Sequence, residues 1–231
     1  MKLKFFVLAT VITMLIPGII IAQDCQSYYP VKQGTVTEIT NYNSYNYVTG
    51  MTRQTVLSNE AMDNGYIVTV KSEGFDSKYS PTGTSEFTYA CKGGKFSINM
   101  KSFLDPKSSS AYKNMNATIS ATDMEMPSSP TVGTSLGEGS VTVAISGSGL
   151  PSLNIDIRVF NRKVAATEKV TTPAGTFDCI KITYEVETKS IVNMTTKGTD
   201  WYAPETGCVK SESYDENGKM IIYSQITKII R

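Results

Sequence analysis

The residues that could carry chemistry in this chain are few, because the sequence contains no histidine. Catalysis by a serine or cysteine with a histidine base is excluded, and so is the commonest protein ligand of zinc and iron. Ser110 and Lys113 match the S-x-x-K nucleophile pattern of penicillin-recognising enzymes. The companion S-D-N and K-T-G motifs are absent, and the match is short enough to arise by chance. The sequence therefore predicts that the protein is not an enzyme.

Paired acidic residues offer the next possibility. Glu185 and Glu187 share one face of a predicted strand, where they lie among lysines. Glycoside hydrolysis needs two carboxyl groups on opposite sides of a cleft, so this pair indicates a solvated sheet face instead. Residues 215–218, Asp-Glu-Asn-Gly, lack the alternating oxygen ligands of a calcium loop and predict a turn. We therefore assign no catalytic, cofactor-binding or metal-binding residue, and expect no cofactor.

Cysteine chemistry is the remaining candidate. The chain has four cysteines, Cys25, Cys91, Cys179 and Cys208. In an exported protein they could form two disulfides, and three connectivities are possible. Strand parity places Cys179 and Cys208 on charged strand faces, which favours a bridge between them and leaves Cys25 to meet Cys91. In a plain meander a strand would separate the first pair beyond disulfide reach. The alternative is that some or all are free thiols.

The first 22 residues are typical of a signal peptide. Lys2 and Lys4 precede an apolar run, a Pro-Gly break follows, and Ala22 ends the segment. This pattern predicts cleavage after residue 22 and export, with an uncleaved membrane anchor as the alternative. Asp24, directly before Cys25, argues against a lipoprotein signal. The full chain of 231 residues has a formal charge of +1. A nearly neutral chain of this kind has no electrostatic footprint for nucleic acid.

The elements that must position these residues are strands. Short runs alternate apolar and polar residues between turn signals, which is the pattern of an antiparallel sheet, and no sustained helical period follows the leader. Gly93-Gly94 predicts a hairpin of residues 86–92 and 95–103, and residues 215–218 predict another of 207–214 and 219–229. Residues 104–113 could form a short helix. We predict an all-β fold, either an open barrel or two curved antiparallel sheets.

Domain organisation depends on residues 127–140, which are rich in Pro, Ser, Thr and Gly. They could link two β domains or connect strands within one. Neither half has enough strands to cover a core, so residues 23–231 are predicted to form a single domain of two β halves joined by this loop.

Aromatic and methionine residues gather in two places. Tyrosines crowd the mature N-terminus, and methionines gather near the middle of the chain. Such side chains fill a core or line an adaptable apolar pocket, and packing is the simpler interpretation here. Trp201, the only tryptophan, is predicted to anchor packing. The residues are Tyr28, Tyr29, Tyr42, Tyr45 and Tyr47, and Met115, Met124 and Met126.

Several of these segments together resemble a known family. Residues 25–30 with Gly34, the turn at 171–179, the segment 201–213 and the terminal 223–229 are similar to the TapB-like exported proteins of Gram-negative bacteria, which are related to a domain-of-unknown-function group. The resemblance implies a secreted or periplasmic, mostly β protein without established activity. Related exported proteins form open barrels or curved sheets, some similar to periplasmic lipoprotein carriers. Cys208 departs from the apolar residue expected there.

Two functional hypotheses follow for an uncharacterised exported protein of the periplasm or cell surface. In the first, a curved sheet binds a lipid or another apolar or amphipathic small molecule. In the second, the chain is an interaction or assembly module for an envelope protein. The sequence identifies neither the ligand nor the oligomeric state.

Overall fold

The computed structural model describes residues 25, 27–101, 116–147 and 150–231. The described residues form antiparallel strands and contain no α-helix. The strands are β1 (Val36–Asn43), β2 (Val48–Met62), β3 (Gly65–Asp76), β4 (Pro81–Lys92), β5 (Lys95–Ile98), β6 (Asn116–Thr122), β7 (Met124–Pro127), β8 (Gly139–Gly147), β9 (Leu150–Thr172), β10 (Gly175–Lys189), β11 (Met194–Ala203), β12 (Gly207–Tyr214) and β13 (Met220–Ile230).

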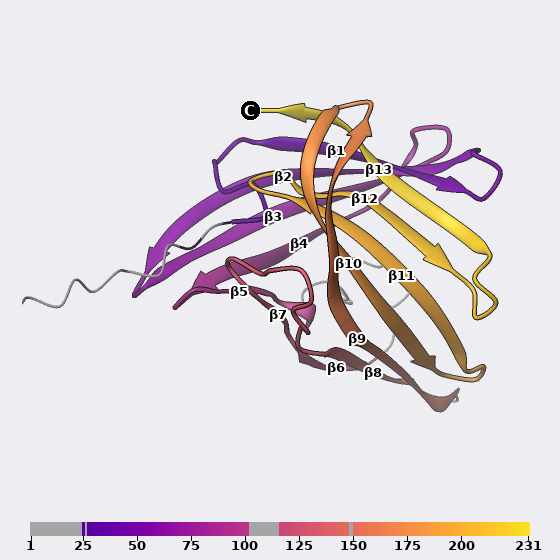
Figure 1. Cartoon of the computed structure of the whole chain (residues 1–231). Helices are drawn as coiled ribbons and strands as arrows, with labels where there is room; N and C mark the ends of the chain where they lie inside the picture. Colours follow the sequence, from indigo (N-terminus) through magenta and orange to yellow (C-terminus); the bar gives the residue numbers. More distant parts are fainter. Residues whose placement is uncertain (1–24, 26, 102–115, 148–149) are drawn as a thin grey trace, which may run out of the picture.

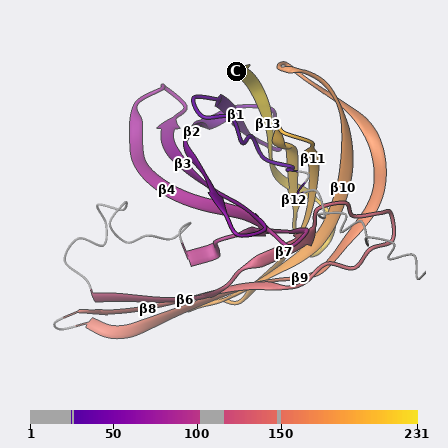
Figure 2. The same cartoon turned by 90° about the vertical axis from the view of Figure 1, so that its left-hand side faces the viewer.

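All these strands belong to one sheet of 13, in the order β6-β8-β9-β10-β11-β12-β13-β1-β2-β3-β4-β5-β7. The first and last strands of the sequence pair at its centre, where Val36 lies opposite Ile230. The sheet curls strongly, so that β2–β4 and β9–β10 face each other across the interior (Figures 1 and 2). This nearly closed sheet confirms the predicted all-β open barrel, and the alternative of two separate sheets does not occur.

The hairpins form where the turn residues indicated. Gly93 and Gly94 both have positive φ between β4 and β5. Between β12 and β13, the Asp215 carboxylate accepts hydrogen bonds from the backbone amides of Asn217 and Lys219, and Gly218 has a φ of 80°. Side-chain acceptors of this kind fix a tight turn locally, which is why these hairpins could be predicted from short sequences.

The connection from β7 to β8 lies along the sheet. The Gly133 amide donates to the Val164 carbonyl at 2.8 Å, and the Leu136 amide donates to the Arg162 carbonyl at 2.9 Å. This connection therefore pairs with the part of β9 that β8 leaves unpaired.

The N-terminal segment, residues 27–31, crosses the interior. The Ser27 carbonyl accepts from the Glu205 amide and the Tyr28 carbonyl from the Gly207 amide, both on the β11–β12 turn. At the other side Cys25 forms a disulfide with Cys91 of β4. We call Cys25 and residues 27–31 the strap, because they tie β4 to the β11–β12 turn.

Cys179 and Cys208 are free thiols, so the bridge that strand parity favoured does not form. The reason is a bulge: Trp201 pairs with Lys210 but Tyr202 pairs with Cys208, which leaves Val209 as an extra residue. The extra residue reverses the side-chain alternation. Cys208 therefore faces the interior, whereas Cys179 packs with Trp201 on the outer face.

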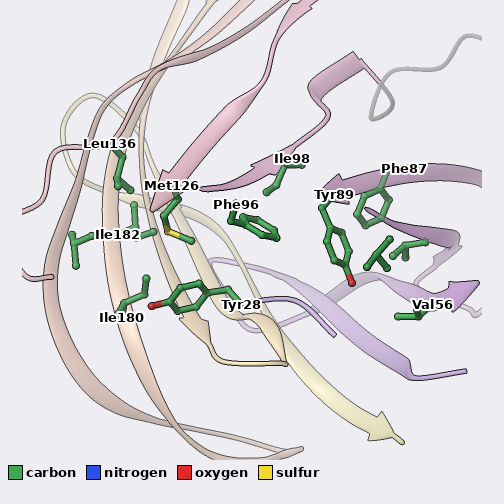
Figure 3. Close-up of a cluster of buried hydrophobic side chains, with 13 residues drawn as sticks. Tyr28, Val56, Phe87, Tyr89, Phe96, Ile98, Met126, Leu136, Ile180 and Ile182 are labelled. Carbon is green, nitrogen blue, oxygen red and sulfur yellow. The ribbon is translucent and has the colours of Figure 1, made fainter. Parts of the chain in front are cut away.

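The main core fills the interior between the strap and the facing strands. Figure 3 shows Tyr28 of the strap, Tyr89 and Phe96 of β4 and β5, and Ile182 of β10 converging there. The Tyr29 ring stacks on Phe96 with centroids 5.4 Å apart. Tyr28 and Tyr29 pack in the core, as the packing interpretation predicts, whereas Tyr45 and Tyr47 of the same N-terminal group are exposed.

Some predictions concern residues outside the described ones: the signal peptide over 1–22, the short helix or loop over 104–113 with Ser110 and Lys113, and the side chain of Met115. Within the described ranges, no helix has the length and apolar character needed to cross a membrane.

Candidate functional site

A polar cluster lies inside the curled sheet, centred on Asp200 of β11. Its Oδ1 accepts hydrogen bonds from the Tyr184 hydroxyl at 3.0 Å and from the Ser211 hydroxyl at 2.6 Å. Its Oδ2 accepts from the Tyr202 hydroxyl at 3.2 Å. Hydrogen bonds to a carboxylate are among the stronger kinds, so the three hydroxyls hold the Asp200 side chain in one orientation.

Three neighbouring strands supply this cluster. Asp200 lies opposite Ile182 of β10 and opposite Ser211 of β12. Tyr184 lies opposite Gly198, and its ring covers the space that a side chain at Gly198 would fill. An aromatic ring over a glycine on the facing strand fixes the ring against the sheet, so the Tyr184 hydroxyl reaches Asp200.

Burial sets the electrostatics of the cluster. It raises the pKa of Asp200 above its ordinary value, and the hydrogen bonds from Ser211, Tyr184 and Tyr202 and the charge of Arg162 only partly oppose it. Burial also raises the pKa of both Tyr184 and Tyr202, and the negative charge of Asp200 adds to it. The two phenols therefore stay protonated as donors at neutral pH.

Arg162 enters the site from a bulge in β9. Thr183 pairs with Lys163 but Glu185 pairs with Phe160, so Asn161 and Arg162 together lie against one residue of β10 and the bulge contains one extra residue. Arg162 Nη1 donates to the carbonyls of Glu125 at 3.1 Å and Gly137 at 2.5 Å. Bulges commonly redirect a side chain beside a functional site. Here the guanidinium joins β9 to β7 and to the β7–β8 connection.

A cavity of about 190 Å³ adjoins the cluster. Arg162, Tyr184, Asp200 and Tyr202 form its polar wall. The apolar wall comes from β7, β9 and β10, namely Met124, Val159, Ile182 and Val186. Val186 of β10 pairs with Val159 of β9 close to the β10–β11 turn, whereas Asp200 and Tyr202 lie farther from that turn along β11. The wall of the cavity nearest the turn is therefore apolar, and its polar groups lie farther from the turn. This distribution suits a molecule with one polar and one apolar end.

The thiol of Cys208 lies on the same inner face as the cluster, because Cys208 is opposite Tyr202. Burial together with the charge of Asp200 raises the pKa of this thiol well above the ordinary value. A protonated thiol is a poor nucleophile. No group of three or more acidic or cysteine side chains among the described residues could hold a metal ion.

A second hollow, of about 340 Å³, lies beside Cys179, with Tyr28 and Ile180 also in its wall. Its wall includes Glu168 and Asp178, which are engaged with Lys181 and Lys169 respectively. Both carboxylates of this hollow already have a lysine partner and also contact solvent. The interior cavity, whose Asp200 is buried, is therefore the better candidate for a binding site.

The structure separates the residues that the sequence singled out. Glu185 accepts a hydrogen bond from Asn161, and Glu187 pairs with Lys189, as expected of a sheet face. Of the methionines, Met124 lines the cavity and Met126 lies in the core.

Asp200 and Arg162 were not identified from the sequence. The feature of the sequence that could have indicated Asp200 is an acidic residue in a predicted strand, directly before Trp201. The bulge that brings in Arg162 carries an asparagine, Asn161, with a φ of 52°, a backbone conformation that asparagine tolerates.

Comparison with known proteins agrees with this fold. A crystal structure from Bacteroides fragilis, provisionally described as an exported protein with a YmcC-like fold, matches with a TM-score of 0.75 and 21% identity, over 90% of this chain and 100% of that one. A structure from Parabacteroides distasonis, provisionally described as a lipoprotein, matches with a TM-score of 0.76 and 24% identity, over 90% of this chain and 100% of that one. No curated protein matches the chain. The family model described as DUF3108-like covers residues 32–226, and the chain therefore belongs to the DUF3108-like family.

Proposed function

We propose that the protein is an exported binding protein that holds a small amphipathic molecule inside its curled sheet. The observation that carries this proposal is the Asp200 cluster: a carboxylate with three hydroxyl donors that faces open space in the interior, beside apolar walls. A buried polar network next to unfilled space costs stability, and a ligand that occupies the space offsets that cost.

The distribution of polar groups defines the ligand class. A hydroxyl or ammonium group can donate to Asp200 or to a tyrosine oxygen at the deep end, while a short hydrocarbon chain contacts Met124, Val159 and Val186. At about 190 Å³, the cavity is smaller than the roughly 300–1,000 Å³ of sites for drug-sized ligands. A single short chain fits this space better than a two-chain lipid does.

Export is part of the same proposal. The predicted leader over 1–22 supports it, and so does the Cys25–Cys91 disulfide, since such bonds persist in oxidising compartments. The similar structures described as an exported protein and a lipoprotein point the same way. The TapB-like resemblance and a place in the periplasm or at the surface of a Gram-negative bacterium belong to this proposal.

Two experiments test the binding site. Native mass spectrometry of the mature protein, purified from its own envelope without detergent, should show a bound small molecule. Titration calorimetry with octanol, octylamine and octanoate should show binding of the first two, weakened about tenfold or more by Asp200→Asn or Tyr184→Phe, because each removes a hydrogen bond at the polar end. Asp178→Asn, at an exposed carboxylate, is the matched control and should leave binding unchanged.

A clean protein mass together with no heat of binding for any of the three probes would overturn the proposal. Equal binding by the Asp200→Asn and Asp178→Asn variants would show that the probes bind elsewhere.

A further inference from the structure

Large apolar side chains are exposed at the tips of turns along one end of the curled sheet. They are Tyr45 and Tyr47 in the β1–β2 turn, Tyr79 in the β3–β4 turn, and Ile191, Val192 and Met194 at the β10–β11 turn. Ile191 is 86% exposed and Tyr45 is 74% exposed. We call these six residues the apolar rim. Turns are usually polar, so a set of bare hydrophobic tips needs an explanation.

Antiparallel topology places these turns together. In a meander every second turn lies at the same end, and β13 pairs antiparallel with β1, so the β1–β2, β3–β4, β10–β11 and β12–β13 turns share one end. Figure 1 shows them along the right-hand side, opposite the C-terminus.

The opposite end differs in composition. Its turns are Asp63-Asn64, Gly93-Gly94, Pro173-Ala174 and 204–206, which are short and mostly polar or small. The exposed large apolar residues at this end are Met62 beside a turn, at 38% exposure, and Ile230 at the C-terminus, at 48%, and neither lies at the tip of a turn. The strap and the C-terminus also lie at this end. Among the described hairpin turns, large apolar side chains at the tips are therefore confined to one end.

The arrangement of the rim side chains favours a lipid bilayer as the partner over a folded protein or a peptide. Its side chains project from three separate hairpins, and none of them lines the interior cavity or the hollow beside Cys179. A helix or a peptide needs a continuous groove, whereas separate tips can each enter a bilayer interface. Tyrosine is enriched at membrane interfaces because its ring is apolar and its hydroxyl is polar.

The charges near the rim indicate what kind of bilayer it fits. The β1–β2 turn carries no charge, and Lys189 is paired with Glu187 at 3.1 Å. In the β3–β4 turn, Asp76 accepts from the amides of Lys78 and Ser80, so this carboxylate holds the turn itself. No excess of lysine adjoins the apolar tips, so attraction to anionic lipid is not the driving force.

We propose that the apolar rim inserts into the headgroup region of a phospholipid bilayer, with the interior cavity opening toward the same end. The inference goes beyond ligand binding and does not depend on it. It accounts for the exposed tips, for their restriction to one end, and for the mixture of tyrosine with aliphatic residues. The level of Val186, close to the β10–β11 turn, places the apolar end of the cavity nearest the bilayer.

The test is flotation of the mature protein with vesicles. The protein should bind both phosphatidylcholine vesicles and vesicles with added phosphatidylglycerol, and binding should persist when salt is raised, since insertion is apolar. Ile191→Ser with Val192→Ser should lower the vesicle partition coefficient about tenfold or more, because two aliphatic side chains lose their contact with lipid.

The matched control is Met62→Ser with Val132→Ser, which also removes two exposed apolar side chains, but away from the rim. It should bind vesicles as the unmodified protein does, and both variants should melt at the same temperature as the unmodified protein because the changed side chains are exposed. Absence of vesicle binding by the unmodified protein, or equal loss in both variants, would overturn the proposal. A dimer in sedimentation velocity that the rim variant alone dissolves would assign the rim to a second copy instead and would also overturn it. Octylamine binding is measured in solution without vesicles. It therefore tests the proposed ligand site separately from the proposed insertion of the rim into a bilayer.

Discussion

Asp200 and Trp201 are neighbours on β11 but lie in contrasting surroundings on the two faces of the sheet. On the outer face Trp201 packs with Val170, Ala203 and Val209, and its indole N–H donates to Glu168. On the inner face Asp200 gathers hydroxyl groups beside an open cavity.

The difference shows that the two faces of one strand can serve different purposes, packing on one side and a polar cavity on the other. Lys181 and Lys210 lie over the Trp201 ring, with nitrogens 5.1 Å and 4.9 Å from its centroid, and their charges reach solvent at the edge of the cluster. The outer cluster thus packs around the Trp201 ring with hydrated charges at its edge, whereas the inner cluster is desolvated and adjoins open space. Filled apolar packing supplies stability, and the inner face retains the unfilled space that a binding site needs.

The strongest way to break this comparison is to remove the outer anchor. Trp201→Ala should lower the free energy of unfolding by about 3–5 kcal/mol, the usual cost of emptying a buried tryptophan site. Urea unfolding followed by circular dichroism measures this. At temperatures where the variant is still folded, its affinity for octylamine should equal that of the unmodified protein, and Trp201→Phe should recover part of the stability.

A loss of stability below about 1 kcal/mol would mean that the outer cluster does not anchor the sheet. A selective loss of octylamine affinity in the folded variant would mean that the two faces are not independent.

The second prediction concerns the strap, which holds the inner face together. Cys25→Ser with Cys91→Ser removes a crosslink between residues 66 positions apart. A crosslink of this span stabilises by about 4 kcal/mol when it acts by restricting the unfolded chain, and measured values more often fall at about 2–4 kcal/mol. Thermal unfolding of the oxidised protein and of the variant measures the loss. The same comparison for Cys179→Ser should give a much smaller change, since that thiol is free.

The contrast between the faces also shows what the sequence could predict. The alternation of apolar and polar residues and the Gly and Asp turn signals predicted the all-β fold and the hairpins at 92–95 and 214–220, because these depend on neighbours in the chain. The inward turn of Cys208 depends on the extra residue Val209, and an inserted residue is not visible in an alternating pattern until its partner strand is known. The site has the same origin: Asp200 meets Ser211 and Tyr184 only through pairing across three strands.

A third prediction disturbs the inner face without altering a polar group. In Gly198→Ala the new Cβ would lie 2.2 Å from Cζ of Tyr184, so the ring must move and its hydroxyl must leave Asp200. Overpacking of this kind costs about 1–3 kcal/mol, and octylamine binding should weaken with it. Gly137→Ala is the control, because a Cβ there meets nothing within 4 Å. Equal melting temperatures for the two variants would contradict the close fit of Tyr184 over β11.

The fourth prediction uses pH. Because the pKa of Asp200 is raised in the folded state, folded Asp200 binds its proton more tightly than unfolded Asp200 does. Its contribution to stability is therefore complete below the ordinary value of 3.8 and declines as pH rises through the folded pKa. Arg162, Tyr184, Tyr202 and Cys208 face this carboxylate, and among them only Arg162 is charged near neutral pH.

Measured in urea at pH 4 and pH 7, the unmodified protein should lose stability relative to Asp200→Asn as pH rises, since the variant has no proton to release there. The other carboxylates cancel in this difference. A difference that stays constant, or that grows in favour of the unmodified protein, would show that Asp200 is stabilised as a carboxylate and not desolvated.

The smallest expected effect returns to the outer face. Lys181→Ala removes one cation from above the Trp201 ring and one partner of Glu168, at a site where water screens the charges. Such contacts contribute about 0.5–1 kcal/mol at exposed positions. Urea unfolding in low and high salt should show a loss of that size. If the loss were as large as that from Trp201→Ala, the outer cluster would depend on its charges as the inner one does. A small loss instead means that hydrated charges only border a packed apolar anchor, while the desolvated carboxylate across the sheet governs the pH response.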